Sequence, residues 1–367
     1  MAKAGRRKFK PTRFMLPDSR YDKQRADHAV AFIENLRHTK GLWAGQPFYL
    51  LDWQEELIRN IFGVIKKNGY RQFNTAFIEL PKKSGKSELA AAVALYMLCA
   101  DGEQSAEIYG CATDRQQAGI VFSVALDMIL QCPALKKRVK IAESQKRIIY
   151  EPTRSVYQVL SSEVASKYGY NVHACIFDEL LGQPNRKLYD VMTKGSGAAR
   201  KQPLNFVITT AGSDKNSICY EVHSKALDIL EGRKYDPTFY PVVYGAPEDA
   251  DWTDPEVWRA ANPSLGVTVD EEYLRLACES AKQNPAEEML FRQFFLCQWT
   301  STAVRWMPMD KWDKCAFPVE ADSLRGRTCY GGLDLSSTTD ITAFVLVFPP
   351  LDESDKYQIL PFFWIPE

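Results

Sequence analysis

The chain has 367 residues, of which 46% are hydrophobic and 25% charged, so it is long enough to bury two hydrophobic cores. Its 46 basic and 46 acidic residues cancel, which excludes a uniformly basic surface for nucleic acid and leaves any DNA contact to local patches. The nine cysteines contain no CxxC pair, and the longest apolar run, Leu89 to Ala100, is too short for a bilayer, so a disulfide framework, a CxxC zinc site and a membrane span are not expected.

The first 40 residues combine a basic arm with a predicted helix. No apolar segment follows the arm, so a signal peptide is not expected and the cytoplasm is the default location. The arm is either a solvated, disordered segment or one that contacts phosphates or a partner. Apolar spacing predicts one helix from about Arg20 to Leu36 and another from Trp53 to Ile65. The basic residues of the arm are Lys3, Arg6, Arg7, Lys8, Lys10 and Arg13.

A strand-like apolar run at 73–80, a loop ending in Gly-Lys-Ser and a helix-like run at 88–99 have the order of a P-loop. The loop amides and the helix N-terminus can hold phosphate oxygens. Lys86 is expected on the β- and γ-phosphates of a nucleotide, and the Ser87 hydroxyl on Mg²⁺. Because Leu80 stands where the motif usually has glycine, a Lys-rich turn before a buried helix is the alternative. The loop residues expected to bind the nucleotide are Lys82, Lys83, Ser84, Gly85, Lys86 and Ser87.

A second apolar run, residues 172–177, closes on Asp178 and Glu179. In an ATPase strand of this form the first acid holds Mg²⁺ through water, and the second orients and deprotonates the attacking water. By itself the run also fits a strand that ends in a solvated turn. Following a Gly-Lys-Ser loop, the acid pair favours ATP hydrolysis, with Glu179 and Lys86 as the catalytic residues.

Strands that alternate with helices predict an α/β fold, a P-loop NTPase with a doubly wound, mainly parallel sheet. Ligands of such sheets lie at the carboxyl ends of the strands, so the loops after Leu80, Phe177 and Ile208 are expected to meet. The other predicted elements are a strand at 107–113, a helix at 114–130 with Thr113 or Asp114 as N-cap, a hairpin of 147–150 and 156–160 around Pro152, a helix at 187–194 and a strand at 205–212.

The pattern changes after the last of these strands. Residues 214–300 are richer in helical spacing and are predicted to form a helical subdomain packed on the core. Three prolines and clustered charge make 301–328 resemble a linker. A new strand with a central acid, Asp334, then begins a final region, 329–367, with two further strands. The predicted divisions are 1–40, 41–213, 214–300, 301–328 and 329–367.

Five motifs together resemble the large terminase subunit of tailed bacteriophages, the motor that packages DNA into procapsids. In this family the P-loop often lacks its first glycine and carries basic residues, as it does here. The resemblance implies an N-terminal ATPase and a C-terminal nuclease of RNase H-like fold, of which 329–367 would be the start. The motifs are Pro81 to Ser87, Ala112 to Ala118, Ile176 to Glu179, Ile208 to Gly212 and Gly332 to Ser336.

The resemblance also implies roles for single residues. Gln54 would read the adenine edge, unless it lies on the exposed face of a helix. Thr209 and Thr210 would form the motif that couples hydrolysis to movement, or else cap the end of a strand. Lys167 would complete a neighbouring subunit's site, where a solvated loop lysine is the alternative.

Asp334 resembles the first metal-binding acid of the nuclease, which uses Mg²⁺ or Mn²⁺. Two-metal hydrolysis needs several carboxylates. The sequence stops at Glu367 after about three strands, so the nuclease is expected to be incomplete. Three further acids, Asp340, Asp352 and Asp355, lie in predicted turns, where solvation is expected.

The implied function is an ATP-hydrolysing, Mg²⁺-dependent motor that moves double-stranded viral DNA into a procapsid in the host cytoplasm. Its partners would be DNA, the small terminase subunit, the portal protein and further copies of itself in a ring, with no membrane. Two alternatives stay open. One is another P-loop DNA translocase or helicase, and the other is a capsid-assembly protein with an inactive nucleotide fold.

Overall fold

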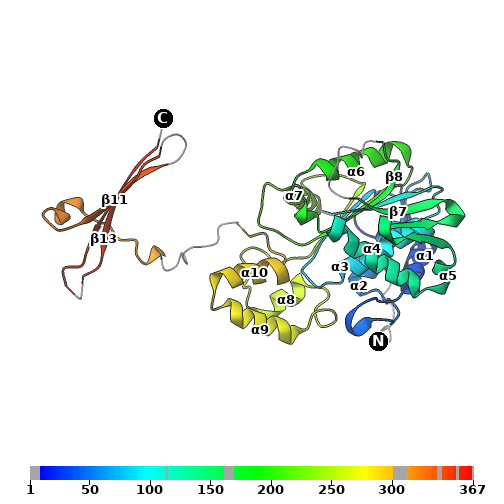
Figure 1. Cartoon of the computed structure of the whole chain (residues 1–367), viewed down its shortest axis with the longest axis horizontal. Coiled ribbons are helices and arrows are strands. Elements are labelled where there is room, and N and C mark those ends of the chain that lie inside the picture. Colours follow the sequence, from blue (N-terminus) through cyan, green and yellow to red (C-terminus); the bar gives the residue numbers. More distant parts are fainter. Residues whose placement is uncertain are drawn as a thin grey trace. The chain divides into compact units, whose positions relative to one another are not determined.

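The computed structural model describes residues 9–112, 115–160, 169–300, 312–336, 341–352 and 355–365. The chain divides into a first unit, residues 1–304, and a second unit, residues 305–367 (Figure 1). Over the described ranges no helix combines the length and the apolarity needed to cross a bilayer.

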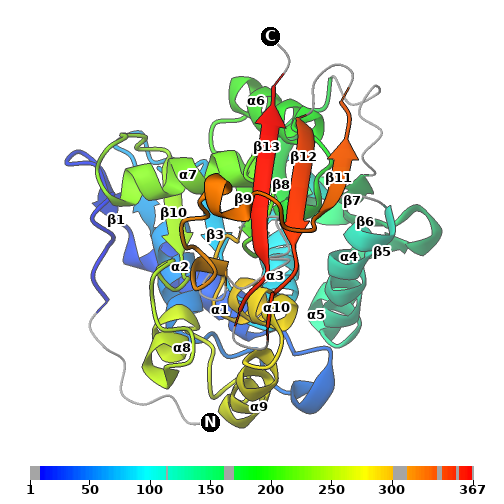
Figure 2. The ribbon, with the colours of Figure 1, turned by 90° about the vertical axis from the view of Figure 1, so that its left-hand side faces the viewer.

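The first unit is built on an eight-stranded sheet in the order β10-β3-β9-β8-β4-β7-β6-β5. In Figure 2 the labelled strands β10, β3, β9, β8, β7, β6 and β5 follow this order. Neighbours from β10 to β7 are parallel, whereas β7, β6 and β5 are antiparallel, so the predicted mainly parallel sheet is confirmed. The strands are β3 (Thr75–Glu79), β4 (Glu107–Cys111), β5 (Val139–Ala142), β6 (Arg147–Tyr150), β7 (Ser155–Leu160), β8 (Val172–Asp178), β9 (Leu204–Thr209) and β10 (Phe239–Val243).

Two of these strands, β5 and β10, were not predicted from the pattern. β10 contains Pro241, which has no N–H for a sheet ladder and therefore argues against a central strand. The structure places β10 at the edge, paired with β3 only, where a proline is tolerated. β5 is a four-residue strand at the other edge, too short for a periodic signal.

Helices cover both faces of the sheet (Figure 1). One face packs in a core with α1 to α4, and the other packs in a separate core with α6 and α7. The helix predicted from about Arg20 begins at Lys23 instead, because Arg20–Tyr21 is a short strand, β1, paired with β2 (Val64–Ile65). The Asp22 side chain caps this helix by accepting a hydrogen bond from the Arg25 amide. For the same reason the helix predicted to reach Ile65 ends at Gly63. The helices are α1 (Lys23–Glu34), α2 (Asp52–Gly63), α3 (Lys86–Cys99), α4 (Arg115–Leu130), α5 (Pro133–Lys136), α6 (Lys187–Ala199) and α7 (Ile218–Leu230).

The expected N-cap of α4, Thr113 or Asp114, lies outside the described residues. Short 3-10 helices connect several elements: η1 (Gly41–Trp43), η2 (Glu143–Gln145), η3 (Glu151–Thr153), η5 (Leu180–Gly182) and η6 (Ala321–Leu324).

Strand alternation decides which side chain meets which layer. In β3, Ala76 and Ile78 lie in the core with α3, whereas Phe77 lies in the core with α7. β8 and β9 alternate in the same way, with Ile176 on the α3 face and Val207 on the α7 face. Successive strand residues point to opposite faces, so the residue at each strand end has a fixed side.

Three helices near the end of the first unit have a core of their own. They are α8 (Pro255–Ala261), α9 (Glu271–Ala281) and α10 (Pro285–Phe295), and their shared core includes Trp258 and Phe291. Side chains of Asp254, Asp270 and Asn284 cap their N-termini. Within the predicted helical stretch 214–300, α7 and β10 instead belong to the layers of the main sheet.

The second unit contains an antiparallel sheet in the order β11-β12-β13. Its strands are β11 (Tyr330–Asp334), β12 (Thr342–Phe348) and β13 (Gln358–Trp364), and all three strands were predicted. The predicted position of Asp334 at the centre of its strand is wrong, because Asp334 is the last residue of β11, opposite Ala343 of β12.

A buried ion cluster lies near the amino ends of the parallel strands β3, β4 and β8 in the first unit. Asp101 accepts two hydrogen bonds from Arg71, at 2.9 and 3.1 Å, and contacts His173 Nε2 at 2.8 Å. Burial alone would raise the pKa of Asp101, but the Arg71 charge and the His173 hydrogen bond outweigh it and leave the pKa below 3.8. The carboxylate is therefore stabilised in its charged form.

We predict that Asp101→Asn lowers the free energy of unfolding by about 3 to 5 kcal/mol at pH 7, because it leaves the buried Arg71 guanidinium without its counter-charge. Since the pKa of Asp101 is depressed on folding, its contribution is complete above the unfolded value and is lost as pH falls through the folded one. The difference between wild type and variant should therefore shrink in acid. Urea unfolding from pH 3 to 8 measures it.

The control is Glu272→Gln, which breaks the exposed pair with Arg275 and should leave the unfolding midpoint nearly unchanged. Equal effects of the two substitutions would contradict a special role for the buried cluster.

Candidate functional site

The predicted phosphate loop connects β3 to α3 and is braced from within. Gly85 caps α3 in the left-handed region, at φ +79°, and Lys83 lies there too, at φ +66°. The buried Ser84 hydroxyl donates to the Pro81 carbonyl at 2.8 Å. The loop thus ends on the free amides of an α-helix N-terminus, an arrangement that suits anions.

Lys86 is buried, and its ammonium lies inside this loop. It donates to the carbonyls of Leu80 and Pro81, at 3.2 and 2.9 Å, and to the Thr210 hydroxyl at 2.7 Å. Its Nζ also lies 3.5 Å from Glu179 Oε1. The lysine therefore joins the loop after β3 to the strand ends of β9 and β8.

Ser87 and Asp178 are in contact on the α3 face of the sheet. The Ser87 hydroxyl donates to Asp178 Oδ2 at 2.9 Å, whereas Asp178 Oδ1 is buried and has no hydrogen-bond partner among the described residues. Burial, followed by repulsion from Glu179, raises the pKa of Asp178 to about 6. A hydroxyl beside a carboxylate with an unused buried oxygen is a set of hard oxygen ligands, and it fits Mg²⁺.

Glu179 leaves the strand through a left-handed turn, at φ +58°. Its amide donates to the Ile208 carbonyl at 2.9 Å, and its carboxylate accepts from the amide and the hydroxyl of Thr210, both at 3.2 Å. Thr210 is thus hydrogen-bonded to both Lys86 and Glu179. Residues held at unusual backbone angles by several contacts are common at functional sites.

Thr209 lies on the other side of the strand end. Its hydroxyl accepts from the Leu181 amide at 3.2 Å and lies 3.6 Å from Cys219 Sγ of α7. The two threonines predicted as one coupling motif therefore differ in position: Thr210 contacts the site directly, and Thr209 supports the turn after Glu179.

Two further predicted residues lie against the phosphate loop. Gln54 is buried in the first turn of α2, so it is not on an exposed helix face, and its Oε1 accepts from Leu51 N at 3.0 Å. Its Nε2 would lie 3.6 Å from a Cβ built on Gly85. Lys82 Nζ lies 3.3 Å from the ring centroid of Phe294, and burial lowers the pKa of this lysine. Lys83, in contrast, is exposed.

Sequence reasoning missed two residues that contact the loop. The Lys82 amide donates to the Phe294 carbonyl at 2.7 Å. The Ser264 hydroxyl accepts from Trp53 Nε1 at 3.0 Å and donates to the Ser84 carbonyl at 3.4 Å. Both belong to the α8–α10 region, about 200 residues along the chain, and no local pattern could have indicated them.

The predicted trans-acting residue, Lys167, lies outside the described residues. So does Asp340. Asp334 is exposed at the end of β11, and the described part of the chain contains no cluster of three or more histidine, cysteine, aspartate or glutamate residues that could hold a metal ion.

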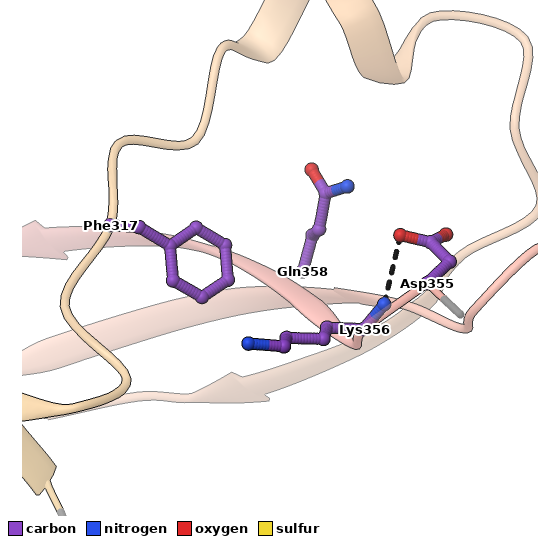
Figure 3. Close-up of a pocket in the computed structure, with 4 residues that line it drawn as sticks. All are labelled: Phe317, Asp355, Lys356 and Gln358. Atoms are coloured by element: carbon purple, nitrogen blue, oxygen red, sulfur yellow. Dashed lines mark hydrogen bonds between the residues drawn. The ribbon is translucent and has the colours of Figure 1, made fainter. Parts of the chain in front are cut away.

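Asp355 is held by structural contacts instead of being solvated as predicted. Its carboxylate accepts from Leu351 N at 2.9 Å and from Arg327 at 3.2 Å, and the Arg327 contact is an ion pair. Figure 3 shows that it lines a pocket together with Phe317, Lys356 and Gln358, and the Lys356 amide donates to it at 2.8 Å. No residue of the phosphate loop lines this pocket.

Two family models match the chain. The "Terminase large subunit, ATPase domain" covers residues 52–227, and the "Terminase large subunit, endonuclease domain" covers residues 233–366. Both contain residues predicted for the corresponding activity, with Lys86 and Glu179 in the first and Asp334 in the second.

Relatives with the same designation are phage proteins. The large terminase subunit of Enterobacteria phage HK97 is 31% identical over 352 residues, which are 94% of this chain and 66% of that protein. The terminase large subunit of Lactococcus phage p2 is 25% identical over 89% of this chain and 61% of its own length. The crystal structure of the HK97 large terminase matches with a TM-score of 0.66 at 30% identity, over 94% of this chain and 68% of that one. The chain thus spans about two thirds, or less, of the length of these relatives.

We predict that Asp178→Asn stabilises the metal-free protein at pH 8. An acid whose pKa is raised on folding binds its proton more tightly in the folded state. The free energy of unfolding therefore falls as pH rises from about 4 to about 6, and it stays at the lower value at higher pH. Removing the charge should therefore increase the free energy of unfolding by up to about 3 kcal/mol at pH 8 and by almost nothing at pH 4. Urea unfolding without Mg²⁺ measures this.

The same substitution should abolish the stabilisation that Mg²⁺ with nucleotide gives to the wild type. Asp190→Asn is the control, since Arg186 lowers the pKa of that acid and its removal should not stabilise the protein at pH 8. A loss of stability in Asp178→Asn that is equal at both pH values would contradict the electrostatic account.

Proposed function

Because this chain belongs to the terminase large subunit family, we propose that it is the ATP-hydrolysing subunit of a motor that moves double-stranded viral DNA into a procapsid. The observation that carries the proposal is the meeting of three loops at one edge of the sheet. There Lys86 contacts Thr210 and Glu179, and Ser87 contacts Asp178. An inactive nucleotide fold would have no need for this complete set of charged and hydroxyl groups.

The residues of the site divide the chemistry between them. The amides of the loop and of the first turn of α3 would bind phosphate oxygens, and Lys86 would exchange its carbonyl contacts for the β- and γ-phosphates. Ser87 and Asp178 would hold Mg²⁺, which would supply positive charge against the phosphates. Glu179 would orient the attacking water and accept its proton. Gln54, beside Gly85, is proposed for the base of the nucleotide.

Thr210 links the nucleotide to the rest of the subunit. Its hydroxyl accepts from Lys86 and donates to Glu179, so loss of the γ-phosphate would change both bonds together. Thr209, one residue earlier, contacts the turn after Glu179 and the helix α7. A rearrangement of this strand end would therefore reach the helical layers, and we propose it as the coupling step.

The second proposed activity is cutting DNA. Asp334 would provide one ligand for Mg²⁺ or Mn²⁺, and two-metal hydrolysis would require further carboxylates besides it. The proposed partners are double-stranded DNA, held by its phosphates, the small terminase subunit, the portal protein and other copies of the chain in a ring, acting in the host cytoplasm.

We predict that the wild-type chain hydrolyses ATP with Mg²⁺, that Lys86→Ala loses nucleotide binding, and that Glu179→Ala binds nucleotide but turns over at least about 10²-fold more slowly. Phosphate release and titration with a fluorescent ATP analogue measure the two properties. Lys83→Ala is the matched control, because this lysine is in the same loop but exposed, and its loss should have a smaller effect than that of Lys86. Full turnover in Glu179→Ala would refute the assigned role.

A further prediction concerns assembly. The described residues place one cation, Lys86, within ion-pair distance of Glu179, and a basic residue from a neighbouring subunit contributes up to about 10³- to 10⁵-fold in related phosphoryl transfers. If Lys167 has this role, specific ATPase activity should rise with protein concentration, and Lys167→Ala should remove the rise. Mixing Lys167→Ala with Glu179→Ala should restore activity, since each variant retains the group that the other lacks.

A constant, high activity in a preparation shown to be monomeric by light scattering would mean that one chain contains the complete site.

A further inference from the structure

Glu79 is a buried acid that the proposed chemistry does not use. It is the last residue of β3, directly before the phosphate loop, and it is fully buried. Its side chain contacts α7, whereas Asp178 contacts Ser87 at the start of α3. His223 Nδ1 of α7 lies 2.9 Å from Oε1, and Trp299 Nε1 donates to both carboxylate oxygens, at 3.3 and 3.2 Å. Glu79 is thus held by two side chains from outside the sheet.

Trp299 also packs against the loop that follows β9. A Cβ built on Gly212 would lie 3.2 Å from Trp299 Cζ3, so the indole packs close to the backbone after β9. The next residue, Thr300, donates its amide to the Gly212 carbonyl at 3.2 Å. Gly212 is two residues beyond Thr210, which bonds to Lys86 and Glu179. One side chain therefore lies between the base of the phosphate loop and the base of the β9 loop.

The segment around Trp299 makes further bonds to the β9 loop. Gln293 of α10 donates to the Ala211 carbonyl at 3.2 Å, and the Ala211 amide donates to Cys297 Sγ at 3.3 Å. Cys297 is buried and has a positive φ of 52°, so the chain turns sharply here. In the sequence, the segment 293–300 lies shortly before the second unit, residues 305–367.

The polar character of this contact is informative. A buried carboxylate costs free energy that an apolar side chain of similar size would avoid. The hydrogen bonds from Trp299 Nε1 and the contact with His223 Nδ1 fix the direction of the Glu79 side chain, which apolar packing alone would not do. The indole also packs edge-on against Tyr220, with ring centroids 4.9 Å apart, so its orientation is fixed from both sides.

We propose that Trp299, through Glu79 and Gly212, is a positioning residue for the ATPase site: it sets the spacing between the phosphate loop and the β9 loop, and it transmits any displacement of segment 293–300 to both. The proposal rests on the ATPase function proposed above. It adds a control point on the opposite face of the sheet from the nucleotide, at the segment that leads out of the first unit. The contacts of Trp299 with Glu79, Tyr220 and Gly212 involve none of the residues proposed to bind ATP or Mg²⁺.

The test compares Trp299→Phe with Trp258→Phe. Both tryptophans are buried and each donates an indole hydrogen bond, but Trp258 donates to the Trp252 carbonyl within the α8–α10 core. Trp299→Phe keeps an aromatic ring and removes the bond to Glu79. We expect kcat for ATP to fall about tenfold or more with KM changed less than about threefold, because small misplacements of reacting groups slow catalysis more than they weaken binding. Trp258→Phe should leave both constants unchanged.

Amide hydrogen exchange of the full chain provides a second readout that does not depend on turnover. Exchange should increase in residues 79–87 and 209–212 of Trp299→Phe and not in those of Trp258→Phe. Wild-type kcat and wild-type exchange in folded Trp299→Phe, even with a lowered Tm, would overturn the proposal. If the wild type has no ATPase activity, the proposed function fails, and the exchange data alone decide whether Trp299 positions the loops.

Substitutions of Glu79 separate geometry from charge. Glu79→Gln keeps an oxygen that can accept from Trp299 Nε1, whereas Glu79→Ala removes it. Activity should be retained better in Glu79→Gln than in Glu79→Ala at equal folded fraction. Equal losses in the two variants would show that the hydrogen bond to Trp299 does not determine the position of the loops.

Discussion

The site depends on three adjacent parallel strands, β3, β9 and β8, that stay in register to their carboxyl ends. Ile78 is paired with Ile208, and Ile208 with Asp178, so the three loops begin at one level. Because side chains alternate between faces, Asp178 faces α3 and the phosphate loop, while Glu79 and Thr209 face α7. A shift of one residue in any of these strands would move its functional group to the wrong layer.

Charge is concentrated in a small buried volume at this edge, and its cost explains the local bonding. Asp178 and Glu179 are consecutive acids whose repulsion contributes to the raised pKa of Asp178. Lys86 offsets this repulsion from within the loop, 3.5 Å from Glu179. Glu179 follows Asp178 with a left-handed backbone, and in this conformation its carboxylate accepts a hydrogen bond from Thr210. Like charges that must lie close together need this kind of separation and compensation.

The sequence predicted the parts of the fold that have strong local patterns. The apolar runs of β3, β8 and β9 and the Gly-Lys-Ser loop indicated both the sheet and the meeting of the three loops. β10 was missed because Pro241 argues against a strand unless its edge position is known. Ser264, Phe294 and Trp299 were missed for a different reason. Ser264 and Phe294 contact the phosphate loop, and Trp299 contacts Glu79 directly before it. Each contact spans about 200 residues of the chain, and a tertiary contact of this kind leaves no periodicity in the sequence.

The loop has Leu80 where the usual P-loop pattern has glycine, and the positions of its left-handed residues explain this difference. Leu80 is fully buried in the core beneath α3, and its amide donates to the Thr209 carbonyl at 3.0 Å, so this position continues the strand. The left-handed residues of the loop are Lys83 and Gly85, and Lys83 accepts a cost of about 1 to 2 kcal/mol there. Contacts from Ser264 and Phe294 hold the loop in this conformation from the α8–α10 side. Position 80 does not need the conformational freedom of glycine, because Leu80 is not among the residues with a positive φ. The loop therefore keeps its geometry with a packed leucine at this position.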